Sequence, residues 1–234
     1  QGGFSGELTR FFMSLSPPLK KILLALAVAI GAILLAGGYL FFQIKRDVDT
    51  DWADAPNSVD ALEARRKLRL FQEAQKVSRR GFVRLSEVEL NSYLEQNYSA
   101  TAAAAQTNAP GSNGLLKSFV SLSVPDVTFY CWVKKRMIGF SVDFVWQRTV
   151  RLERTADRWN FPVQAMKVGN LEIRPRFWQL ANRHLGGADQ AFSKQFDWLA
   201  HLPGLEIAEN ELSHRPELRL YTYAAKAGGR EAKH

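Results

Sequence analysis

The stretch ILLALAVAIGAILLAGGYLFF, residues 22–42, contains no charged residue and sets the organisation of the whole chain. Lys20 and Lys21 precede it, and Lys45 and Arg46 follow it. A helix needs roughly 20 apolar residues to cross a hydrocarbon core about 30 Å thick, and cationic residues at its ends can reach lipid headgroups. The pattern predicts a transmembrane helix over residues 19–46, preceded by a cytoplasmic or interfacial segment, 1–18.

A secretory signal peptide is the alternative interpretation, because the run lies near the N-terminus and is rich in alanine. The apolar part of a signal peptide is typically about 7–15 residues long, and small residues mark its cleavage site. This run is longer and ends in the bulky residues 39–42, Tyr-Leu-Phe-Phe. The pattern therefore favours a retained anchor.

The charges beside the anchor predict its orientation. Cytoplasmic flanks carry an excess of Lys and Arg, and positive residues rather than net charge are counted. More of them precede the run than follow it: Arg10, Lys20 and Lys21, against Lys45 and Arg46. We expect a single-pass protein of the cell membrane, with its N-terminus in the cytoplasm and its main domain outside, in the periplasm.

Four alanines share one face of the predicted anchor. Ala25, Ala29, Ala32 and Ala36 are spaced by four, three and four residues, which places them on one stripe of a helix. Small side chains let a second helix approach closely, so the stripe predicts a helix-packing face for an integral-membrane protein partner. The alternative is that alanine is simply common in such segments.

The rest of the chain is long enough for one domain with its own core. We expect a juxtamembrane linker and helix over 47–80, an extracytoplasmic α+β domain over 81–223, and a polar tail over 224–234. The single Cys131 can form no internal disulfide and is expected to be a small buried residue.

The formal net charge of +8 raises the question of nucleic-acid binding. The basic clusters carry no nucleic-acid motif: residues 65–69 are expected on a helix, and Lys134, Lys135 and Arg136 in a hairpin turn. We therefore expect membrane lipids and membrane proteins as partners, and no nucleic acid.

Two helices are expected before the strands. The first covers Ser58 to about Val77. The second covers Glu87 to about Asn97, because Ser86 and Glu89 form a capping box and Leu85 can pack on Leu90 as a hydrophobic staple. Residues 99–114 are rich in Ala, Thr, Asn and Gly and predict a flexible insertion, although residues 102–105 could prolong the helix.

Alternation of apolar and polar residues then predicts an antiparallel sheet with one strongly apolar, aromatic face. The expected strands cover 116–124, 127–133, 138–146 and 159–165. Two helices should follow, one from about Phe177 to Leu185 and one carrying Phe192, Phe196 and Leu199. Two last strands, around 205–207 and 218–223, complete an α+β fold with a curved antiparallel sheet packed on helices.

No catalytic or metal-binding constellation stands out. His184, His201 and His214 are far apart in sequence and lack the spacing of metal ligands. Glu87 and Glu89 are explained by the helix cap and do not converge on one substrate atom. We therefore expect neither an enzyme nor a cofactor.

The order of motifs resembles the YpmS-like and LmeA-like bacterial envelope proteins, which are related in style to the tubular lipid-binding superfamily. The resemblance covers roughly Gly81 to Tyr223 and rests on an N-terminal anchor, the segment LSEVELNSYL at 85–94, the strands, and VGNLEIRP at 168–175 opening a helix. It implies a curved antiparallel sheet wrapped over a helix at the bilayer, with a groove that accommodates lipid. It carries no catalytic residues, and the insertion at 99–114 departs from the compact version of the pattern.

Two functions are consistent with these features. The first is a non-catalytic accessory or assembly subunit of a larger membrane complex, and the second is a lipid-binding or lipid-transfer module. The residues expected to line an apolar groove are Phe129, Phe140, Phe144, Trp146 and Phe161. If they close onto the domain's own helices, no lipid fits; if a continuous apolar cavity remains, one does.

Overall fold

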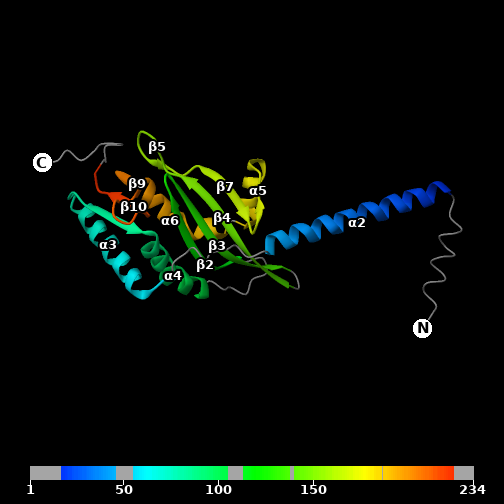
Figure 1. The fold of residues 1–234 in the computed structure, drawn as a ribbon, viewed down its shortest axis with the longest axis horizontal. Coiled ribbons are helices and arrows are strands. Elements are labelled where there is room, and N and C mark those ends of the chain that lie inside the picture. Colours follow the sequence, from blue (N-terminus) through cyan, green and yellow to red (C-terminus); the bar gives the residue numbers. More distant parts are fainter. Residues whose placement is uncertain (1–16, 46–54, 105–112, 138–139, 186, 224–234) are drawn as a thin grey trace. The chain divides into compact units, whose positions relative to one another are not determined.

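The computed structural model describes residues 17–45, 55–104, 113–137, 140–185 and 187–223 (Figure 1). The chain divides into two compact units, Gln1–Gln43 and Ile44–His234. The first contains most of helix α2, Pro17–Lys45. Its window Leu24–Ile44 is long and apolar enough to cross a membrane, and none of that window is buried. The prediction of an N-terminal helix suited to spanning a membrane is confirmed to that extent.

The second unit is an α+β domain whose paired strands are all antiparallel. The larger sheet has the order β2 (Asn113–Ser123), β3 (Asp126–Met137), β4 (Phe140–Arg151), β7 (Val163–Val168) and β8 (Leu171–Glu172). The smaller sheet has the order β1 (Phe82–Ser86), β10 (Pro216–Tyr221) and β9 (Gly204–Glu209). A short hairpin joins β5 (Glu153–Arg154) to β6 (Trp159–Asn160).

The helices of this unit flank the two sheets. They are α3 (Ser58–Lys76), α4 (Glu87–Ala104), the 3-10 turn η1 (Pro175–Phe177), α5 (Trp178–Leu185) and α6 (Gly187–Ala200). Figure 1 shows α3 beside α4, and α6 next to the larger sheet. The coarse α+β prediction is confirmed.

The predicted helix starts follow from side chains that cap backbone donors. The Glu89 N–H donates to Ser86 Oγ at 3.2 Å, and the Ser86 N–H donates to Glu89 Oε2 at 2.9 Å, which is the reciprocal capping box. At the start of α3, the Asp60 N–H donates to Asn57 Oδ1 at 2.9 Å. Both helices therefore begin where the sequence indicates.

Several boundaries differ from the sequence-based expectation. The basic residues 134–136 lie in strand β3 rather than in a turn, and Lys134 pairs with Asp143 across the ladder. Helix α4 continues to Ala104, so the first part of the expected insertion 99–114 is helical. Residues 105–112 lie outside the described part of the chain. The strand expected over 159–165 is divided at Phe161-Pro162 into β6 and β7, because proline cannot donate to the ladder.

Strand β1 was not expected, because it is only five residues long and precedes the capping box directly. It pairs with β10, with Leu85 opposite Leu218. Val83 and Leu85 point inward while Phe82 and Arg84 point outward. The strand places Leu85 in the core, whereas the sequence predicted only its packing on Leu90 at the start of a helix.

Helix α4 is attached to β2, the edge strand of the larger sheet, by side-chain hydrogen bonds. Asn91 Nδ2 donates to the Val120 carbonyl at 3.0 Å, and the Val120 N–H donates to Asn91 Oδ1 at 2.7 Å. The Leu122 N–H donates to Glu87 Oε2 at 2.8 Å. Buried backbone groups on a sheet edge need partners, so these bonds fix α4 against the sheet.

Candidate functional site

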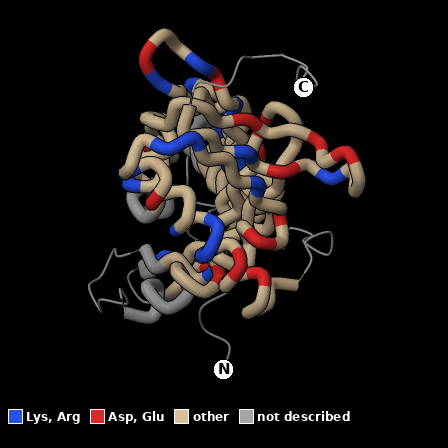
Figure 2. The backbone as a smooth tube through the Cα atoms, turned by 90° about the vertical axis from the view of Figure 1, so that its left-hand side faces the viewer, with Lys and Arg blue, Asp and Glu red and all other residues tan. Residues whose placement is uncertain are grey.

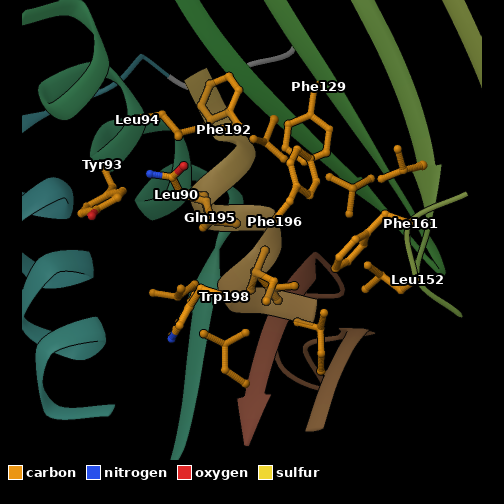
Figure 3. A pocket seen from close by; sticks show the side chains of 18 of the residues that line it. Leu90, Tyr93, Leu94, Phe129, Leu152, Phe161, Phe192, Gln195, Phe196 and Trp198 are labelled. Carbon is orange, nitrogen blue, oxygen red and sulfur yellow. The ribbon is translucent and has the colours of Figure 1, made fainter. Parts of the chain in front are cut away.

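A cavity of about 330 Å³ lies inside the second unit (Figure 3). Its walls come from α3, α4 and α6, from the larger and the smaller sheet, and from Leu152 after β4 and Phe161 before β7. The lining is mostly leucine, valine and phenylalanine, with Tyr93 and Trp198 also present. Its volume falls within the roughly 300–1,000 Å³ typical of small-molecule sites.

Aromatic rings from α6, from β3 and from the segment before β7 meet at one wall of this cavity. The ring centroid of Phe196 lies 5.2 Å from that of Phe129 and 5.4 Å from that of Phe161. The Phe192 ring lies 6.4 Å from Phe129. In Figure 3 these rings and Leu152 line the cavity on the side of the sheet. These rings line the cavity without filling it, since the volume of about 330 Å³ remains beside them.

The structure separates the five residues expected to form a groove. Phe129 and Phe161 line the cavity. Phe144 and Trp146 do not; they are 6% and 1% exposed and lie in the neighbouring apolar cluster with Cys131 and Met166. The side chain of Phe140 lies outside the described part of the structure. The aromatic face is thus partly closed core and partly cavity wall.

The cavity also uses residues that the sequence reading did not assign to a site. Leu68 comes from α3, Leu85 from β1, and Leu205, Leu218 and Leu220 from β9 and β10. The alternation of Val83 and Leu85 with outward-pointing neighbours was the available signal for β1. Without that strand, the smaller sheet could not be placed against the larger one.

Three solvent-exposed side chains mark the rim of the cavity. Among the lining residues, Gln72 of α3 and Lys194 and Gln195 of α6 are exposed, and the others are buried or half-buried. Next to this rim, the rings of Phe71 and Trp198 meet edge to face with centroids 6.1 Å apart. The rim therefore lies along the seam between α3 and α6.

Among the described residues, the titratable groups with shifted pKa values lie outside the cavity. Glu217, Arg219 and Tyr221 belong to the smaller sheet, and Tyr130 and Arg151 to the larger sheet. Burial alone would raise the pKa of Glu217, but hydrogen bonds from Asn210 and Arg219 outweigh it and hold that pKa below its ordinary value. Burial, and then the nearby Glu206 carboxylate, raise the pKa of Tyr221. The contacts of Glu217 and Tyr221 join β10 to β9 and to the turn that follows β9, and none of the five residues in these contacts lines the cavity.

No cluster of three or more His, Cys, Asp or Glu side chains suited to a metal ion occurs among the described residues. Figure 2 shows basic and acidic residues interspersed along the described chain in that view. Chemically, the cavity offers apolar contact and aromatic surface, with amide groups and one ammonium group at its rim.

No family model, curated protein or solved structure matches the chain. The chemistry of the cavity is therefore the basis for the functional assignment.

Proposed function

We propose that this protein is a non-catalytic, single-pass membrane-anchored protein whose domain binds the hydrocarbon chain of a lipid. The observation that carries the proposal is the apolar cavity of about 330 Å³ between the sheets and helices α3, α4 and α6. It supports the lipid-binding alternative, because apolar space remains beside Phe129 and Phe161 after the aromatic residues have packed.

The size of the cavity supports an occupant. Unfilled apolar volume in a core costs about 24 cal/mol per Å³. The cavity of about 330 Å³ is lined mostly by apolar side chains, so an apolar occupant would stabilise the domain. Water gains little from such a space, since apolar cavities of about 150 Å³ stay dry and bind small hydrocarbons. An apolar ligand removes most of this cost.

The rim supports a ligand with one polar end. The chain of the ligand would lie against Phe129, Phe161 and Phe196, and its polar end would meet Gln72 and Lys194 at the seam between α3 and α6. Lipids have this construction, and helix α2 is apolar enough to hold the protein in a membrane where they are abundant. The resemblance to tubular lipid-binding proteins implies a sheet that curves over a helix and encloses lipid. The proposed function includes this arrangement.

A photo-reactive lipid tests the proposal in the full-length protein. Cells are fed a fatty acid carrying a diazirine near the end of its chain, membranes are irradiated, and cross-linked peptides are mapped by mass spectrometry. We expect cross-links on α6 and β3 in addition to those on α2. Helix α2 serves as the internal control, because an anchor contacts bilayer lipid whatever the domain does. Cross-links confined to α2 would refute the lipid-binding function.

An accessory or assembly subunit is the second candidate. The observation that favours it is the alanine stripe of α2, since Ala25, Ala29, Ala32 and Ala36 are all exposed in the isolated chain. Close approach of a partner helix would cover them. The two functions are compatible, because one concerns the anchor and the other the domain.

The proposed location of the domain is the periplasm, with the N-terminus in the cytoplasm. A cysteine at Asp157, in the exposed turn between β5 and β6, tests it in a Cys131→Ala background. A thiol reagent that cannot cross the inner membrane should label this cysteine in cells of which only the outer membrane has been permeabilised. Labelling only after complete lysis would reverse the orientation.

A further inference from the structure

Helix α3 is apolar on two sides. Its inner side is buried: Ala61, Ala64 and Phe71 are 1%, 0% and 3% exposed. Ala64 and Phe71 belong to the cluster that includes Leu85 of β1. The inner side therefore holds the helix against the domain, and the outer side is exposed to solvent.

The outer side carries a second set of aliphatic residues. Val59, Leu62, Leu70 and Val77 are 73%, 60%, 56% and 72% exposed. With Arg66 and Glu73, the positions 59, 62, 66, 70, 73 and 77 recur every three or four residues, which places them on one stripe of the helix. We call these four aliphatic residues the outer stripe of α3. Single exposed apolar residues are common, but four in one stripe mark an interaction surface.

Basic residues border the outer stripe. Arg66, Arg69 and Lys76 are exposed, against the exposed acids Glu63 and Glu73, while Arg65 Nη2 donates to Asn97 Oδ1 of α4 at 3.3 Å. Two of the arginines are engaged along the helix, with Arg66 Nη1 4.0 Å from Glu63 Oε2 and Arg69 Nε 3.0 Å from Glu73 Oε1. Exposed pairs of this kind contribute little, so the guanidinium groups can exchange these partners for lipid phosphates.

We propose that the outer stripe of α3 docks on the surface of an anionic bilayer. Aliphatic residues flanked by arginine and lysine are the composition of helices that lie in a membrane interface, with the long basic side chains reaching the headgroups. A protein interface would typically be centred on aromatic residues, and the stripe has none. The inference rests on the proposed membrane anchorage but not on the ligand of the cavity.

The length of the chain makes the same membrane the nearest candidate surface. Residues 46–57 separate α2 from α3, and twelve residues reach at most about 40 Å. The chain therefore limits the start of α3 to within about 40 Å of the end of α2.

Depth measurements in the full-length protein test the docking. Leu70→Cys, in a Cys131→Ala background, is labelled with a fluorophore and reconstituted into vesicles of phosphatidylcholine with phosphatidylglycerol, with a quencher on the lipid chains. Asp157→Cys, an exposed position in the turn between β5 and β6, is the matched control. We expect about threefold greater quenching at position 70 than at position 157, and more quenching as the anionic fraction rises.

Three results would overturn the proposal. Equal quenching at the two positions would show that the outer stripe faces water, and quenching that is the same in neutral and anionic vesicles would remove the role of the basic border. Protection of position 70 from a water-soluble quencher in native membranes but not in vesicles would identify a protein as the occupant. Each result leaves the cross-links of the cavity unaffected, so failure here is distinguishable from failure of the lipid-binding function.

Discussion

Filling the cavity should abolish lipid binding without unfolding the protein. Leu94 of α4 and Leu152, after β4, line the cavity from two separate elements and are only half-buried (Figure 3). The double variant Leu94→Trp/Leu152→Trp places two indole rings in the space that the hydrocarbon chain would occupy. Neither side chain takes part in the capping box or in the side-chain hydrogen bonds that hold α4 to β2.

The expected change in stability is small because two effects oppose each other. Each Leu→Trp change adds about 60 Å³, roughly the share of two liquid waters, so the pair fills about a third of the 330 Å³. At about 24 cal/mol per Å³, this recovers roughly 3 kcal/mol of cavity cost. Overpacking typically costs about 1–3 kcal/mol. The free energy of unfolding of the ligand-free protein should therefore change by less than about 2 kcal/mol.

The ligand-bound protein should behave differently. A ligand at about one hundred times its dissociation constant stabilises the folded state by about 2.7 kcal/mol. Urea denaturation of the full-length protein in mild detergent, with and without palmitate, should show that gain in the wild type and none in the double variant. Leu212→Trp, at a 95% exposed leucine outside the cavity, should keep the gain. An equal gain from palmitate in all three proteins would refute the assignment of the cavity as the binding site.

Three further predictions follow from separate features. Asn91→Ala should lower the free energy of unfolding by about 2–5 kcal/mol, because it leaves two buried backbone groups of β2 without partners; a loss under about 0.5 kcal/mol would contradict this role. Glu217→Gln should cost about 1.5–3 kcal/mol at neutral pH. Because the folded-state pKa of Glu217 is lowered, the difference in unfolding free energy between wild type and variant should be constant above pH 4.5, the ordinary pKa, and should shrink as the pH falls below it. A difference that stays constant in acid would show that the Glu217 carboxylate is not its cause. Ala29→Leu with Ala32→Leu should reduce co-purification of a membrane partner, whereas Ala27→Leu should not; equal retention in both would leave α2 a simple tether.

Local features of this fold could be predicted where neighbouring residues determine them. The capping box of α4 needs only Ser86 and Glu89, and both of its hydrogen bonds form. The strands β2, β3 and β4 follow from the alternation of apolar residues, and Val133 opposite Phe144 shows that the apolar positions face one side. The period of two along a strand carries this information without knowledge of the rest of the chain.

Long-range features could not be predicted in the same way. The sequence predicts a hairpin turn at Lys134, Lys135 and Arg136, yet strand β3 continues through them to Met137, and Lys134 is exposed. Likewise, Phe129 and Trp146 belong to the same aromatic face, but one lines the cavity and the other is closed core. That difference depends on the position of α6 against the sheet. The alternation of residues along the strands does not predict this position.

The persistence of the cavity can be explained by how its walls are joined. On one side, α4 is tied to β2 by the amide of Asn91, and α3 is tied to α4 by the Asn57 N–H, which donates to Ser92 Oγ at 3.1 Å. On the other side, α6 meets the sheet and α3 through aromatic rings, with Phe196 on Phe129 and Trp198 on Phe71. Hydrogen bonds fix a distance, whereas ring contacts tolerate several geometries from about 4.5 to 7 Å. Helix α6, which carries these rings, also borders the rim of the cavity through Lys194 and Gln195.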